Sequence, residues 1–119
     1  MKRKQFHLGD LLSVTTGRLL SPVGIKGVYN ILNHLTGANL FTHELPYAAK
    51  VCTPYLEKQF PFLKEITEIP EFNGSKEAVI KWLKEMGEVY GEFHIVEQLP
   101  KEAFQRKSLV EILNELKEE

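Results

Sequence analysis

The sequence contains only one cysteine, one tryptophan and two methionines among its 119 residues. One cysteine, Cys52, can form neither an internal disulfide nor a cysteine-based zinc site, so disulfide-stapled scaffolds and zinc fingers are excluded. Long apolar runs are missing as well, and short ones such as Leu11-Leu12 fall far below the roughly 18 residues that cross a bilayer. The basic start Met1–Lys4 is followed by no apolar segment, which argues against a secretion signal. These absences predict a protein of the reducing cytoplasm with no membrane partner.

The remaining composition is that of an ordinary globular domain, with 43% apolar and 26% charged residues. The length predicts a single domain, 1–119. The net charge of −1 hides an asymmetry, because residues 1–60 carry a net charge of +4 and residues 61–119 a net charge of −5. An anionic partner should therefore meet the basic N-terminal half. The alternative is that the acidic C-terminal half simply carries solvated Glu and Lys on its helix faces.

Apolar residues at helical spacing predict three helical stretches in the first half. The first covers about 8–16 and ends at Gly17, a residue that readily adopts the left-handed conformation of a helix end. The second opens at Ser21-Pro22, a plausible cap with a first-turn proline, and ends at Gly37. The third is interrupted by Pro54, which predicts either a kinked helix or two short ones.

The second half predicts a strand over 64–69, a helix from Ser75 to Gly91 and a strand over 92–97. A last helix opens at Ser108, with Glu111 in capping-box spacing, and continues to the end of the chain. The helix that begins at Ser75 should anchor the core of this half through one apolar side: Val79, Trp82, Leu83, Met86 and Tyr90. The fold class is therefore α+β, mainly helical, with about five helical segments and a small two-stranded ribbon.

Several continuous groups of residues in the first half are distinctive. They are residues 7–22 (HLGDLLSVTTGRLLSP), 27–33 (GVYNILN), 35–37 (LTG) and 39–46 (NLFTHELP). Together they resemble a family of small, functionally uncharacterised proteins encoded by tailed bacteriophages and prophages. The resemblance covers about half of the chain and supplies no catalytic residue and no cofactor. It implies a cytoplasmic protein in a bacterial host cell, acting as an accessory protein that binds a host defence protein or a signalling nucleotide.

One candidate ligand site is the turn after the first helix, which combines Thr15, Thr16 and Arg18. Two hydroxyls and a guanidinium are groups that hold a phosphate or carboxylate, and arginine offers a planar fork of donors. The pattern matches neither the phosphate loop that ends in Gly-Lys-Ser/Thr nor the dinucleotide glycine motif. The alternative is an ordinary helix end with a surface arginine.

A second candidate is the polar side of the second helix, where Lys26, Asn30, Asn33 and His34 share one face. Asparagine is a poor helix former, so two of them on an exposed face indicate directional hydrogen bonding. The bonding partner is either an anionic small ligand, with Arg18 as a charged clamp and Lys26 as a second charge, or the following loop.

The loop after the second helix adds His43, which can serve as a base or as an anion contact. In the alternative reading Thr42 caps the third helix, and Glu44 lies near the positive end of that helix.

Two further function classes stay open beside a non-catalytic binding protein. A helix-turn-helix DNA-binding regulator is one, because asparagine pairs with adenine edges, although the connection 17–22 exceeds the usual three or four residues. A small hydrolase using Cys52 or His43 is the other. Cys52 lies in an apolar stripe, however, which predicts a buried thiol. We expect no metal and no cofactor, and the sequence leaves the oligomeric state open.

Overall fold

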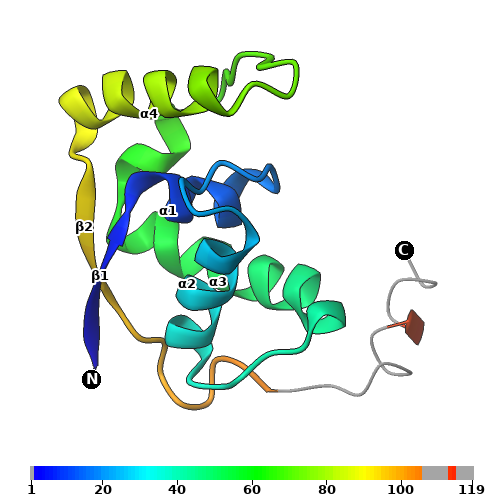
Figure 1. The fold of residues 1–119 in the computed structure, drawn as a ribbon. Helices are drawn as coiled ribbons and strands as arrows, with labels where there is room; N and C mark the ends of the chain where they lie inside the picture. Colours follow the sequence, from blue (N-terminus) through cyan, green and yellow to red (C-terminus); the bar gives the residue numbers. More distant parts are fainter. Residues whose placement is uncertain (1, 106–112, 115–119) are drawn as a thin grey trace.

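The protein is an α+β fold built mainly from helices, as predicted. A computed structural model describes residues 2–105 and 113–114. In chain order its elements are β1 (Arg3–His7), α1 (Leu8–Thr16), α2 (Ile25–Thr36), the 3-10 turn η1 (Thr42–Glu44), α3 (Leu45–Gln59), the 3-10 turn η2 (Pro61–Glu65), α4 (Lys76–Tyr90) and β2 (Phe93–Glu97). The helices α1, α2 and α3 pack against one another, the β1–β2 ribbon runs along one flank, and α4 lies across one end (Figure 1).

Helix α1 has the bounds predicted from its apolar spacing. Its first turn is closed by His7, whose Nδ1 accepts a hydrogen bond from the Gly9 N–H at 2.9 Å. The Asp10 carboxylate accepts from the His7 N–H at 3.3 Å, which completes a capping box. At the other end Gly17 has φ +75°, the left-handed conformation expected of a terminating glycine.

Helix α2 begins at Ile25, so the predicted start at Ser21-Pro22 is wrong. Residues 22–24 form a turn instead, in which the Gly24 N–H donates to the Ser21 carbonyl at 3.1 Å. Gly24 has φ +69°, which no right-handed helix accommodates. The predicted end at Gly37 is confirmed by its φ of +72°.

Helix α3 continues through Pro54 as one helix, so of the two alternatives the pair of short helices is wrong. Proline removes one backbone donor and crowds the preceding turn. Close to this point the Thr53 hydroxyl donates to the Ala49 carbonyl at 2.7 Å, which gives that carbonyl a side-chain partner in the disturbed turn. Leu45, Ala48, Cys52 and Leu56 keep the helix packed on the core despite the interruption.

The predicted strand 92–97 is confirmed as β2, but its partner is β1 and not the segment 64–69. The two strands are antiparallel, with a register that runs from Arg3 opposite Glu97 to His7 opposite Phe93. The prediction of a strand at 64–69 is wrong. Residues 61–65 form the turn η2, and the buried side chains of Leu63 and Ile66 are three residues apart, the spacing of a helical turn and not of a strand.

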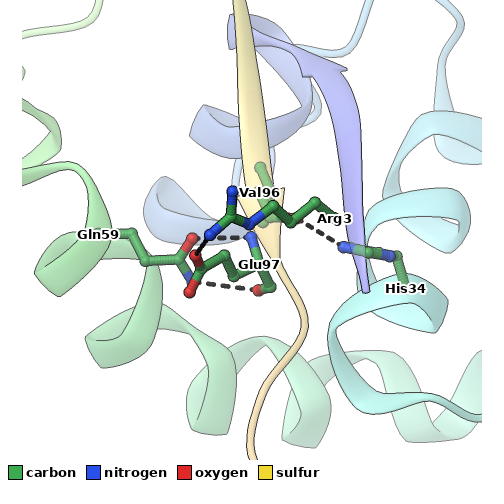
Figure 2. Close-up of polar contacts among 5 residues, drawn as sticks. All are labelled: Arg3, His34, Gln59, Val96 and Glu97. Carbon is green, nitrogen blue, oxygen red and sulfur yellow. Dashed lines mark hydrogen bonds and ion pairs between the residues drawn. The ribbon is translucent and has the colours of Figure 1, made fainter. Parts of the chain in front are cut away.

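Strand β2 is also tied to two helices (Figure 2). The Gln59 side chain at the end of α3 donates to the Glu97 carbonyl at 3.1 Å and accepts from the Glu97 N–H at 2.9 Å. From α2, His34 Nε2 lies 2.8 Å from the Val96 carbonyl. Arg3 adds an ion pair to Glu97 across the ribbon at 3.0 Å. The ribbon is therefore fixed to the helical core by side chains from both α2 and α3.

Helix α4 has the predicted cap at Ser75 and the predicted end at Gly91. Its apolar side is less buried than expected, because Leu83 alone in α4 is fully buried. Trp82 is half-buried and packs against Phe72, with ring centroids 5.8 Å apart. The helix predicted from Ser108 onward lies largely outside the described residues. Two of its residues, Leu113 and Asn114, are described, and both are helical.

Candidate functional site

The predicted polar face of α2 opens onto a hollow of about 350 Å³ between this helix and the start of β1. We call it the polar hollow. Its lining residues are mostly amides and cations: Lys2, Lys4, Asn30, Asn33, His34, Gly37, Ala38, Asn39 and Gln98. Three of the predicted site residues, Asn30, Asn33 and His34, therefore lie together as expected.

Two of these three side chains also support the fold. Asn33 accepts a hydrogen bond from the Leu40 N–H at 2.9 Å through Oδ1, which leaves its amide NH₂ as a donor. His34 Nε2 faces the Val96 carbonyl, and a carbonyl can only accept, so Nε2 carries the hydrogen and Nδ1 is an acceptor in the neutral ring. Asn30 is exposed. Asn33 and His34 therefore have the structural role that was one of the two predicted alternatives, while groups on the same face still point to the hollow.

The two lysines of the hollow were not among the predicted site residues. Lys4 lies in β1 and Lys2 directly precedes that strand, and both line the hollow together with residues of α2. The Lys4 ammonium lies 5.5 Å above the centre of the Phe6 ring. The basic residues 2–4 are evident in the sequence. Their position beside α2 could not be predicted, because it depends on a strand whose partner lies about 90 residues away in the chain.

The electrostatics of the polar hollow favour an anion. None of the described residues that line it carries a carboxylate, while two carry ammonium groups. Asn30, Asn33 and Gln98 supply amides, which offer both donors and acceptors. The hollow is thus suited to a ligand with a negative charge and a hydrogen-bonding edge.

Arg18 does not belong to this hollow. Its guanidinium donates to the carbonyls of Ile69 at 3.2 Å and Pro70 at 3.1 Å, so it ties the loop after α1 to the segment before α4. It lines a separate groove of about 650 Å³, here called the Arg18 groove, which lies between residues 18–24 and residues 71–79.

The hydroxyls of Thr15 and Thr16 turn back onto their own helix. The Thr16 hydroxyl donates to the Leu12 carbonyl at 2.6 Å and accepts from the Arg18 N–H at 3.2 Å. Thr15 makes a longer contact of 3.5 Å to the same carbonyl. The structure therefore separates this predicted turn from the polar face of α2.

Lys26 and His43 lie outside the residues that line the polar hollow. Lys26 is exposed on the first turn of α2. The ring of His43 stacks on that of Phe41, with centroids 5.9 Å apart and planes 10° apart, and both side chains are exposed. Thr42, beside them, is hydrogen-bonded to the Tyr29 hydroxyl.

Cys52 is buried in α3 and unpaired, as predicted. Desolvation by burial raises the pKa of its thiol to about 12. A thiol in this state is protonated at neutral pH and is a poor nucleophile.

The described residues, 2–105 and 113–114, also bear on two other classes of site, metal centres and membrane-spanning helices. This part of the chain contains no cluster of three or more side chains able to hold a metal ion. It also contains no helix long and apolar enough to cross a membrane.

Comparisons with known proteins place the chain in a family without assigning it an activity. No curated protein and no solved structure matches it. A family model described as a domain of unknown function, DUF7736, matches residues 6–66, a region that begins in β1 and extends through α1, α2, α3 and η2. That region contains the Asn30, Asn33 and His34 side of the polar hollow, whereas Lys2, Lys4 and Gln98 lie outside it. Since the match covers half of the chain, the protein belongs to the DUF7736 family.

Proposed function

We propose that this protein acts by binding, without catalysis, and that the polar hollow receives a small anionic ligand of nucleotide type. The observation that carries the proposal is the position of Lys2 and Lys4 beside Asn30, Asn33 and His34, in a hollow whose described lining contains no acidic side chain. The basic N-terminal segment and the amide-rich face of α2 therefore line the same hollow.

Each group has a suitable task toward such a ligand. The ammonium groups of Lys2 and Lys4 would meet the phosphate, because hydrogen bonds between charged partners are roughly twice as strong as neutral ones. The amides of Asn30, Asn33 and Gln98 can read a base or a sugar, since each offers donor and acceptor side by side. The volume of about 350 Å³ lies at the lower end of the range for ligand pockets, which favours one nucleotide over a larger molecule.

The biological setting follows from the resemblance of residues 7–46 to proteins of tailed phages and prophages. In this proposal the protein is an accessory protein that works in the cytoplasm of an infected bacterium. Sequestering a signalling nucleotide suits the polar hollow, while contact with a host defence protein is the alternative mode of binding.

The experiment is a set of calorimetric titrations at low ionic strength with inorganic phosphate, adenosine monophosphate, a cyclic dinucleotide and a short DNA duplex. We expect the mononucleotide to bind, and the affinity to fall as salt screens the lysines. The double variant Lys2→Ala/Lys4→Ala should weaken binding about tenfold or more, and Asn30→Ala should weaken it less. Lys81→Ala, an exposed lysine of α4 outside the hollow, is the matched control and should bind like the wild type.

Other results would redirect the proposal. If no anion binds the wild type, the polar hollow is not a ligand site, and a protein-binding surface becomes the better reading. If only the duplex binds, with a steep dependence on salt, the protein is a DNA-binding regulator. Turnover of any nucleotide would contradict the non-catalytic mode and favour the hydrolase reading.

A further inference from the structure

The Arg18 groove is the larger of the two hollows and lies outside the proposed nucleotide site, with which it shares no lining residue. We propose that it binds a small amphipathic anion, a free molecule with an apolar body and one negatively charged group. Three features of the described residues carry this inference: a preformed shape, an apolar wall and a small positive charge.

The shape of the groove is held by bonds between segments that are distant in the chain. Arg18 donates to the carbonyls of Ile69 and Pro70 at 3.2 and 3.1 Å, and its guanidinium lies 5.5 Å from the centre of the Phe72 ring. Phe72 in turn packs against Trp82 of α4. Because both walls are fixed before a ligand arrives, binding loses little free energy to ordering the protein.

The apolar wall includes side chains that are more than half exposed to solvent. Leu19 is 56% exposed and Val23 is 61% exposed, on the loop between α1 and α2. Phe72 and Val79, both half-buried, line the groove from the opposite segment. A ligand between the two walls would bury these groups, which is favourable in proportion to the apolar area removed from water. The volume of about 650 Å³ lies in the middle of the range for small-molecule sites.

The charge around the groove selects an anion. Arg18 and Lys76 contribute two positive charges and Glu71 one negative charge, so the charged lining residues carry a net charge of +1. Arginine has five N–H donors, and the two carbonyl contacts of Arg18 leave others for a ligand. A ligand that places its anionic group near Arg18 and Lys76 and its apolar body along Leu19 and Val23 would fit the shape, the apolar wall and the charge of the groove.

The test is a fluorescence titration with 8-anilinonaphthalene-1-sulfonate, a probe that combines an aromatic body with one sulfonate. We expect saturable binding with one probe per chain, displaced by decanoate but not by the neutral decanol at equal concentration. Adenosine monophosphate should not displace the probe, which separates this site from the polar hollow. Thermal unfolding of each variant, measured alongside, verifies that the probe meets folded protein.

Two variants and two matched controls decide the location. Val23→Asp should weaken binding about tenfold, because it removes apolar contact and adds a repelling charge. Lys76→Glu should weaken it about fivefold through charge reversal. Ile80→Asp and Lys81→Glu make the corresponding changes, β-branched apolar residue to aspartate and lysine to glutamate, at exposed α4 positions outside the groove and should bind like the wild type. Binding that does not saturate, that ignores both groove variants, or that falls equally in the controls would overturn the proposal.

Discussion

Several polar side chains of residues 1–60 that were predicted to bind a ligand form hydrogen bonds to backbone groups of the protein instead. Thr16 bonds to the Leu12 carbonyl and to the Arg18 N–H, and Arg18 itself holds two carbonyls more than fifty residues away in the chain. The Asn33 amide holds the Leu40 N–H. The sequence correctly indicates that Asn33 makes a directional hydrogen bond, but for Thr16 and Arg18 it does not reveal the backbone partners, because a ligand offers the same hydrogen-bonding groups as a backbone carbonyl or N–H.

At the same scale, Cys52 makes the alkaline stability of the protein predictable. Burial raises its pKa from 9.0 to about 12, so the folded state keeps a proton that the unfolded state releases. The contribution is fully present below pH 9 and is lost as the pH rises toward 12, at about 1 kcal/mol per pH unit. The free energy of unfolding of the wild type should therefore fall more steeply above pH 9 than that of Cys52→Ala, in denaturant titrations at pH 8, 9 and 10.

A thiol-reactive reagent gives an independent measurement on the same residue. The native wild type should react slowly, at the rate of opening of the fold, because α3 buries the sulfur. Parallel pH profiles of the wild type and Cys52→Ala, or rapid labelling of native protein, would show that the thiol is accessible.

At the scale of elements, local sequence signals predict most helix ends correctly. The predictions are wrong for elements whose bounds depend on contacts with distant segments. The apolar residues at helical spacing, together with Gly17, Gly37 and Gly91, correctly predicted where α1, α2 and α4 end. The start of α2 was missed because the Ser21 hydroxyl is engaged by the Asp10 carboxylate of α1 at 2.5 Å, a contact that no local pattern shows. Strand β1 was missed because a five-residue strand is specified by its partner β2 and by the Phe6 side chain that it buries.

The close packing of α2 against α1 requires a glycine at position 27. A Cβ there would collide with the Ser21 hydroxyl and the Asp10 carboxylate. Gly27→Ala should therefore lower the free energy of unfolding by about 2 kcal/mol, measured by urea denaturation, because the two helices must move apart.

Gly87→Ala in α4 is the matched control for this substitution. Its new Cβ would meet the Glu92 side chain and backbone at 3.3 Å, a contact that a small shift relieves. We expect a change within about 1 kcal/mol, since alanine also favours a helix interior. Equal losses in the two variants would show that the close approach at Gly27 is not decisive.

At the scale of the whole molecule, the family region and the rest of the chain share one core. Residues 6–66 supply α1, α2 and α3, yet Leu83, Val96, Leu99 and Phe104 are buried in the same cluster. The basic and acidic halves thus contribute to one buried cluster, and the polar hollow also takes Gln98 from the acidic half. The charge asymmetry read from the sequence describes composition and not a boundary in the fold.

A truncated chain tests this unity. A fragment of residues 1–66 loses four buried apolar side chains and the partner strand of β1, so it should show no cooperative thermal unfolding by circular dichroism. The longer fragment 1–105 keeps all of these residues and is the control, with a cooperative transition expected. A sharp transition in the short fragment would mean that the family region folds by itself.

The pairing of β1 with β2 also bears on synthesis at the ribosome. The strand Arg3–His7 is translated about 90 residues before its hydrogen-bonding partner Phe93–Glu97. Until β2 is translated, the nascent chain carries an unpaired basic strand, a state open to wrong pairing with other chains. Closing so long a loop is slow relative to forming the helices between. The beginning of the chain is therefore among the last parts of the fold to be completed.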